Sequence, residues 1–162
     1  MTIFQTKANR VVVSGTVDIE NTGDSGQINL ATGTNDTMNI HGDVVKVGAL
    51  GTNGTLTIGQ GTIGADTMLQ LYAPGSNGTV NFIANVTLSG AGAKIIAGNT
   101  VNIFDNIVVT IGGSNHASVY TNHANYTGFG GNGTRTGTFG GAGANNPQPL
   151  ANAPPFDPPA RR

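Results

Sequence analysis

A phrase of four residues, threonine then apolar then small polar then apolar, recurs five times along this chain. The copies are Thr16-Val17-Asp18-Ile19, Thr37-Met38-Asn39-Ile40, Thr55-Leu56-Thr57-Ile58, Thr79-Val80-Asn81-Phe82 and Thr100-Val101-Asn102-Ile103. Their starts are 21, 18, 24 and 21 residues apart. Alternation of apolar and polar residues is typical of a strand with one buried face. Recurrence of such a strand at a period of about 20 residues predicts a solenoid.

A second series of short alternating segments lies between these phrases. Its members are Ile28-Asn29-Leu30, Val45-Lys46-Val47, Leu69-Gln70-Leu71, Val86-Thr87-Leu88 and Val109-Thr110-Ile111. Further apolar residues at Ile63 and Ile95-Ile96 supply a possible third face. Two or three parallel strands in each coil predict a β-helix of about five coils over residues 11–113.

The phrase also predicts which side chains point inward and which point outward. The apolar residues of the five copies are expected to form internal columns, such as Val17, Met38, Leu56, Val80 and Val101. The outward ladder is expected at Thr16, Asp18, Thr37, Asn39, Thr55, Thr57, Thr79, Asn81, Thr100 and Asn102. The dipeptides Asn53-Gly54 and Asn77-Gly78 are strong turn signals, and each directly precedes a copy of the phrase.

The composition changes after Gly112. Residues 1–10 are expected to be an N-terminal extension, and residues 114–162 a glycine-rich and then proline-rich arm. Six of the seven prolines lie between Asn145 and Arg162. Apolar residues are nevertheless spaced along this arm, and we expect the arm to be ordered only where they pack on the solenoid or on a partner. These expected anchors for self-association are Phe129, Phe139, Leu150 and Phe156.

Composition narrows the classes of partner. Only 9% of the 162 residues are charged and the net charge is −1, which argues against binding to nucleic acid or to an anionic membrane. No segment approaches the ~20 apolar residues of a membrane-spanning helix, so no membrane insertion is expected. The chain has no cysteine. Residues 1–10 lack the apolar stretch of a signal peptide, so an extracellular location would require export information outside this sequence.

The sequence offers little chemistry for catalysis. His41, His116 and His123 are the only histidines, and none has a second ligand at metal-binding spacing. The acidic residues are scattered, without the basic neighbours that a polysaccharide lyase on this fold would need. The segment from Gly128 to Gly133 is rich in glycine but does not join a strand to a helix, as a nucleotide-binding loop does. We therefore expect no enzyme, no cofactor and no metal site.

The repeated phrase and its glycine- and asparagine-rich turns resemble the repeats of large bacterial surface exoproteins of the filamentous-haemagglutinin and adhesin type. The segments Val119-Tyr120-Thr121-Asn122 and Tyr126-Thr127-Gly128-Phe129-Gly130-Gly131 are similar to the ends of such proteins. The resemblance of the repeats covers residues 11–113 and implies a right-handed parallel β-helix at the cell surface. It carries no catalytic residues over to this chain.

These observations predict a structural protein. A solenoid without capping helices has unpaired strands at both ends, which favours head-to-tail stacking of copies into a filament. The alternative is an adhesin-type module that binds glycans through the outward threonine and asparagine face. That face also resembles the Thr-x-Thr array of ice-binding proteins, although only Thr55-Leu56-Thr57 has the full form. A degenerate enzyme acting on polysaccharides is the third possibility.

Overall fold

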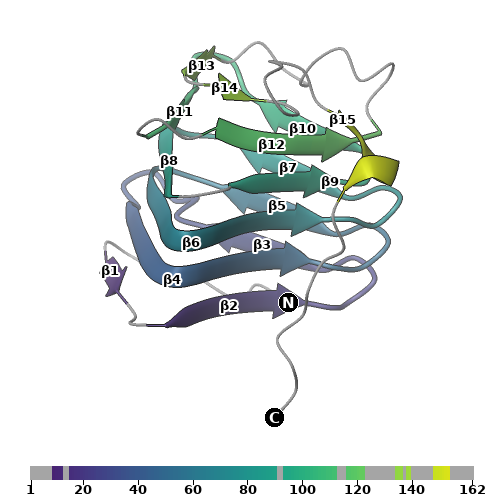
Figure 1. Cartoon of the computed structure of the whole chain (residues 1–162), viewed down its shortest axis with the longest axis horizontal. Coiled ribbons are helices and arrows are strands. Elements are labelled where there is room, and N and C mark those ends of the chain that lie inside the picture. The colour runs from purple at the N-terminus through teal and green to yellow at the C-terminus, as the bar shows by residue number, and fades with distance from the viewer. Residues whose placement is uncertain are drawn as a thin grey trace.

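The computed structural model shows a parallel β-solenoid of about four coils (Figure 1). The structure describes residues 9–12, 15–90, 93–112, 116–122, 134–136, 138–139 and 148–153. All strand pairs in these segments are parallel, and the one helical element is the short 3-10 turn η2 (Leu150–Asn152). None of the helical segments within these residues is long or apolar enough to cross a membrane. The predicted β-helix is confirmed.

Each coil has three faces, which we number in the order that the chain visits them. Face 1 stacks β1 (Asn9–Val12), the first part of β4 (Met38–Ala49), the first part of β6 (Gly61–Ala73), β8 (Val86–Gly90) and β11 (Val108–Ile111). Face 2 stacks β2 (Thr16–Asn21), the second parts of β4 and β6, β9 (Lys94–Ala97) and β12 (His116–Thr121). Face 3 stacks β3 (Gln27–Leu30), β5 (Thr55–Ile58), β7 (Thr79–Phe82) and β10 (Thr100–Ile103).

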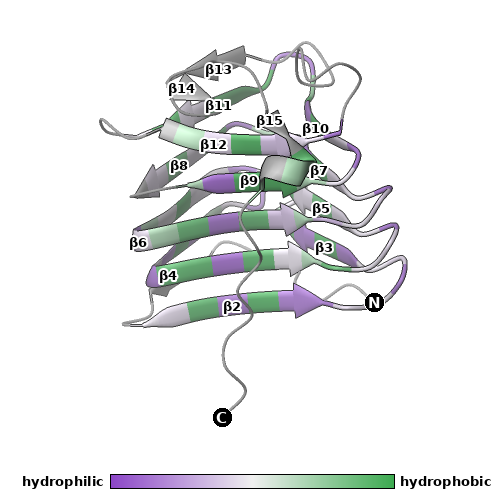
Figure 2. Ribbon diagram, turned by 45° about the vertical axis from the view of Figure 1, so that its right-hand side comes forward, coloured by the Kyte–Doolittle hydropathy of each residue, from purple (hydrophilic) through white to green (hydrophobic). Residues whose placement is uncertain are grey.

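The long strands β4 and β6 form two faces each because they bend at a corner (Figure 1). The register between them shifts at Gly42 and Val44, which marks the bend. A Cβ at Gly42 would lie 2.9 Å from the carbonyl oxygen of Gly15, so this corner has no room for a side chain. Figure 2 shows hydrophobic and hydrophilic residues alternating along β2, β4 and β6, as expected for strands with one face inward.

The corner between faces 2 and 3 is built from stacked glycine turns. The backbone N–H of Gly54 donates to the carbonyl of Gly51, and the N–H of Gly78 donates to that of Gly75, at 3.0 and 2.7 Å. A Cβ at Gly75 would overlap the carbonyl oxygen of Gly51 in the coil below. Main-chain bonds also join successive turns: the N–H of Asn77 donates to the carbonyl of Thr52 at 3.0 Å. The Asn-Gly dipeptides therefore mark this corner, as the sequence indicates.

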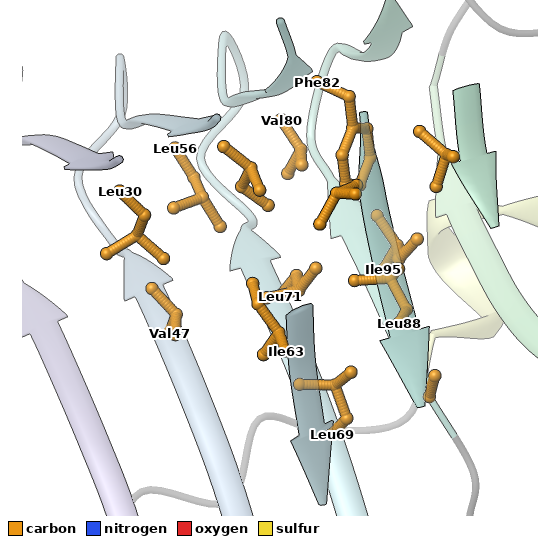
Figure 3. Close-up of a cluster of buried hydrophobic side chains, with 14 of the residues drawn as sticks. Leu30, Val47, Leu56, Ile63, Leu69, Leu71, Val80, Phe82, Leu88 and Ile95 are labelled. Atoms are coloured by element: carbon orange, nitrogen blue, oxygen red, sulfur yellow. The ribbon is translucent and has the colours of Figure 1, made fainter. Parts of the chain in front are cut away.

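The solenoid is filled by one apolar core (Figure 3). Leu56, Val80 and Phe82 of face 3 are fully buried, and Leu71 and Ile95 of face 2 lie across from them. Every apolar residue of the five phrases except Ile19 is buried, and Ile19 is partly buried against the core. The inward direction predicted from the alternation is thus correct at each copy.

The predicted stacking of the five phrases on one another is wrong. The copies at Thr55, Thr79 and Thr100 do lie in register on face 3. The copy at Thr16 lies on face 2, where Val17 pairs with Val45, and Met38 begins the face 1 part of β4, where it pairs with Gly61. The residue beneath Leu56 on face 3 is instead Ile28, from the second series. The phrase occurs on all three faces because any strand with one inward side produces it.

The solenoid also extends beyond the expected limits of residues 11 and 113. At its start, β1 pairs with β4 from Asn9 onward. At its end, β12 stacks on β9, β13 (Thr134–Thr136) stacks on β11, and both β14 (Thr138–Phe139) and β15 (Gln148–Pro149) pair with β12. The described parts of the arm therefore continue faces of their own solenoid.

Candidate functional site

The outward side of face 3 carries two columns of polar side chains. Its described rungs contribute Gln27, Thr55, Thr79 and Thr100 to one column, and Asn29, Thr57, Asn81 and Asn102 to the other. All but the exposed Gln27 are half-buried. Neighbouring rungs of a sheet lie about 4.8 Å apart, and outward residues along one strand about 6.6 Å apart. Face 3 thus presents hydroxyl and amide groups on a regular grid.

Side-chain hydrogen bonds link the rungs of face 3. The amide of Asn102 donates from Nδ2 to Oδ1 of Asn81 at 2.7 Å, and also receives a bond at Oδ1 from the Thr100 hydroxyl at 3.3 Å. The hydroxyl of Thr79 donates to that of Thr55 at 3.5 Å. These bonds hold the side chains in fixed positions and stabilise the stack, since each one joins successive coils or neighbouring columns.

The other four members of the predicted ladder lie elsewhere. Thr16 and Asp18 are exposed on β2 of face 2. Thr37 and Asn39 are also exposed, one directly before β4 and one within its face 1 part. The ten residues are therefore divided among three faces, and only the six from Thr55 to Asn102 share one surface.

Face 1 carries a threonine column that the sequence pattern did not reveal. Asn39, Thr62, Thr87 and Thr110 occupy successive rungs in register. Thr62, Thr87 and Thr110 are half-buried and Asn39 is exposed. Part of the signal lies in the second series, where Thr87 and Thr110 each stand between two inward apolar residues. The alignment does not follow from the pattern, because Asn39 belongs to one of the five phrases and Thr62 to neither series.

His41 and Asp66 meet on the outside of the solenoid. Nε2 of His41 lies 3.3 Å from Oδ1 of Asp66, and the two side chains are 43% and 68% exposed. An exposed pair of this kind contributes little to stability. Among the described residues no three histidine, aspartate or glutamate side chains gather to hold a metal ion. His116 begins β12, and its side chain lies outside the described residues, as does the whole of His123.

The expected arm anchors are only partly placed. Leu150 begins η2, where it is half-buried, and η2 packs against β12 of the same chain. Phe139 lies in β14, with its backbone beside Ala117. Phe129 and Phe156 lie outside the described residues. The contacts that the structure shows for this arm are made within one chain, and the role of the anchors in self-association stays a prediction.

The two ends of the solenoid differ. At the N-terminal end, β1 and β2 each pair on one side only, with β4, and β3 pairs only with β5. At the C-terminal end, β13, β14 and β15 add partial rungs above β11 and β12. Within the described residues, no strand pairs with the outer side of β1, β2 or β3, although the Asn21 side chain donates from Nδ2 to the outward carbonyl of Gln27 at 3.2 Å.

Comparison with known proteins identifies no relative: no family model, no curated protein and no solved structure matches this chain.

Proposed function

We propose that this chain is a structural subunit that self-associates head to tail into a fibre at the cell exterior. The observation that carries the proposal is the open edge of the first coil, where β1, β2 and β3 have one pairing side each among the described residues. A long unpaired edge is a template for another chain, and a head-to-tail contact that does not close into a ring produces a filament. The cysteine-free and weakly charged composition supports a surface location.

The direction of the main-chain groups in β3 identifies what a second copy would bind. In a strand, the N–H and C=O of one residue point to the same side, and successive residues alternate. The carbonyl of Leu30 points to β5, since it accepts the N–H of Gly59 at 2.7 Å. The N–H and C=O of Asn29 therefore point to the open edge. A copy stacked below would bind these groups and extend the asparagine column of face 3.

The test is negative-stain electron microscopy of the full chain across a concentration series. Fibres of uniform width with an axial repeat of about 24–29 Å, which is five or six rungs at the strand spacing, would support the proposal. Dispersed monomers at every concentration would contradict it.

A matched pair of variants locates the joint. Asn29→Pro removes the N–H that points to the open edge and leaves intact the bonds to β5, and proline is tolerated on edge strands. We expect this variant to fold and to lose fibres. Asn29→Ala keeps the N–H and should still form them. Equal assembly by both variants would exclude this edge from the joint.

The second candidate function is glycan binding through face 3. The specific observation is the regular grid of hydroxyl and amide groups on this face, held by the bonds between Asn81 and Asn102 and between Thr55 and Thr79. A glycan array probed with the wild-type chain and with Thr57→Val would test it, because valine keeps the shape of threonine and removes the hydroxyl. Thermal hysteresis, measured on the same two proteins, tests ice binding.

A further inference from the structure

The outward side of face 2 is buried at its central rungs, unlike the outward sides of the other two faces. Its rungs align two outward columns: Asp18, Lys46, Gln70, Lys94 and Ser118, and Glu20, Gly48, Tyr72, Ile96 and Tyr120. In the middle of these columns, the exposed fractions are 6% for Lys46, 2% for Gln70, 8% for Tyr72 and 1% for Ile96.

The direction of these side chains follows from their neighbours. Leu69, Leu71 and Ile95 belong to the apolar core. Alternation along each strand therefore places Gln70, Tyr72 and Ile96 on the outside, and Tyr72 and Ile96 are buried without belonging to the core cluster.

Neighbouring rungs alone do not bury outward side chains in this solenoid. Thr57 and Asn81 occupy central rungs of face 3, and Thr62 and Thr87 occupy central rungs of face 1. All four are half-buried rather than buried. The burial of Lys46, Gln70, Tyr72 and Ile96 therefore requires a further layer over the central rungs of face 2. The described residues supply such a layer at one end, where η2 packs against β12; Gln70 and Tyr72 lie two rungs away, on β6 (Figure 1).

Gln70 also has an unsatisfied hydrogen-bond acceptor on this face. Its Oε1 atom is buried, and the described residues offer it no hydrogen-bond donor. A buried acceptor without a donor costs about 1–3 kcal/mol, so the position is suited to a chain that brings an N–H group across the face.

The segment that follows η2 has the length to cover face 2. After Ala153 the chain continues for nine residues, Pro-Pro-Phe-Asp-Pro-Pro-Ala-Arg-Arg. In the polyproline conformation that such a sequence favours, nine residues span about 28 Å. The four steps from β12 to β2 span about 19 Å at the strand spacing.

The chemistry of the two surfaces is also complementary. Proline-rich segments dock on surfaces lined by aromatic rings, and Tyr72 and Tyr120 stand in one column of face 2. At the far end of the face, β2 presents Asp18 and Glu20. A segment that starts beside β12 would bring its two terminal arginines to these carboxylates.

We propose that the outward side of face 2 is a docking surface for residues 154–162 of the same chain. The segment runs from β12 toward β2 over Ile96, Tyr72 and Gln70, and its terminal arginines lie near Asp18 and Glu20. It acts as a strap that ties the last coil to the first. Face 2 is then occupied, and faces 1 and 3 remain for other partners. This inference does not depend on fibre formation.

The absence of cysteine from the chain makes a direct test possible. A single cysteine is introduced by Gln70→Cys, and its rate of reaction with a maleimide is measured in the full chain and in a chain ending at residue 153. We expect the reaction to be at least about tenfold faster in the shortened chain, as for a site that changes from buried to open. Thr57→Cys on face 3 is the control, and its rate should be the same in both chains.

Three results decide the proposal. Protection that is independent of protein concentration and lost on shortening supports docking within one chain. Equal rates in both chains overturn the proposal. Protection that grows with concentration also overturns it, in favour of a second copy on this face.

A second variant keeps the proposal testable if the shortened chain does not fold. Arg161→Glu combined with Arg162→Glu preserves the length of the segment and reverses its charge. In the Gln70→Cys background it should accelerate labelling, because the terminal glutamates would repel Asp18 and Glu20. An unchanged rate would contradict the proposed direction of the segment.

Discussion

Gly75 lies directly over Gly51 at the corner between faces 2 and 3, so closely that a Cβ on Gly75 would overlap the carbonyl oxygen of Gly51. The same relationship recurs one coil further along, between Gly98 and Gly75. The close stacking of coils at this corner therefore requires glycine for a steric reason, and it allows the turn carbonyls to accept bonds from the next coil.

Gly75→Ala should destabilise the solenoid by about 2 kcal/mol or more, because the overlap with Gly51 can be relieved only by a shift of backbone. Gly23→Ala is the matched control, since Gly23 occupies the same turn position in the first coil. Its nearest non-neighbouring atom would be Oδ1 of the Asn21 side chain, at 3.3 Å, and that side chain can move. Urea unfolding of the two variants measures the difference in stability. Equal losses in the free energy of unfolding would show that the close contact between Gly75 and Gly51 does not account for the effect.

The asparagine pair on face 3 should show energetic coupling. Because Asn102 donates to Asn81 at 2.7 Å, a double-mutant cycle with alanine at both positions should give a coupling of about 0.5–1.5 kcal/mol in the free energy of unfolding. Asn29 and Asn102 stand in the same column on non-adjacent rungs. A cycle on Asn29 and Asn102 should give a coupling near zero. If the two cycles gave similar couplings, the coupling of Asn81 and Asn102 could not be assigned to their hydrogen bond.

Asp18 should make stability depend on pH. The Asp18 side chain is exposed, but the surrounding protein removes part of the water around its carboxyl. This desolvation raises the pKa of the Asp18 carboxyl above its ordinary 3.8, and the nearby Lys46 ammonium opposes that rise. The folded state therefore holds the proton more tightly than the unfolded state does. This contribution to stability is complete below pH 3.8 and is lost as the pH rises through the folded-state pKa.

Asp18→Asn removes the titrating carboxyl, so the variant does not lose this stability as the pH rises. Its free energy of unfolding relative to wild type should increase from pH 3 to pH 7, and urea unfolding at the two pH values measures the change. Lys46→Gln should raise the pKa of Asp18 further, and carboxyl titration by NMR would detect the change. A fall in the pKa of Asp18 in that variant would contradict the assignment of Lys46 as its opposing charge.

The two phenylalanines near the end of face 3 should respond very differently to truncation. Phe82 is fully buried in the core, whereas Phe104 is 49% exposed. Phe82→Ala should cost about 3–5 kcal/mol through lost burial and the cavity left behind. Phe104→Ala should cost about 0.5 kcal/mol or less. Thermal and urea unfolding measure both, and a large loss at Phe104 would reveal a contact beyond this chain's own core.

The sequence by itself determined the class of fold and the direction of side chains within each strand. Alternation is a local property, so Val17, Met38 and Leu56 could each be assigned to the interior from their immediate neighbours. The Asn-Gly turns were likewise visible, because the need for a tight corner is expressed in two adjacent residues.

Only the tertiary structure decided which strands stack on one another, and thus which outward residues share a surface. Along face 3 the register steps run from Ile28 to Leu56, Val80 and Val101, or 28, 24 and 21 residues. Coil length varies because the turns vary, so a fixed period assigns strands to the wrong face. The burial of Gln70 and Tyr72 was hidden for the same reason, since it depends on contacts between residues distant in the chain, which local alternation does not record.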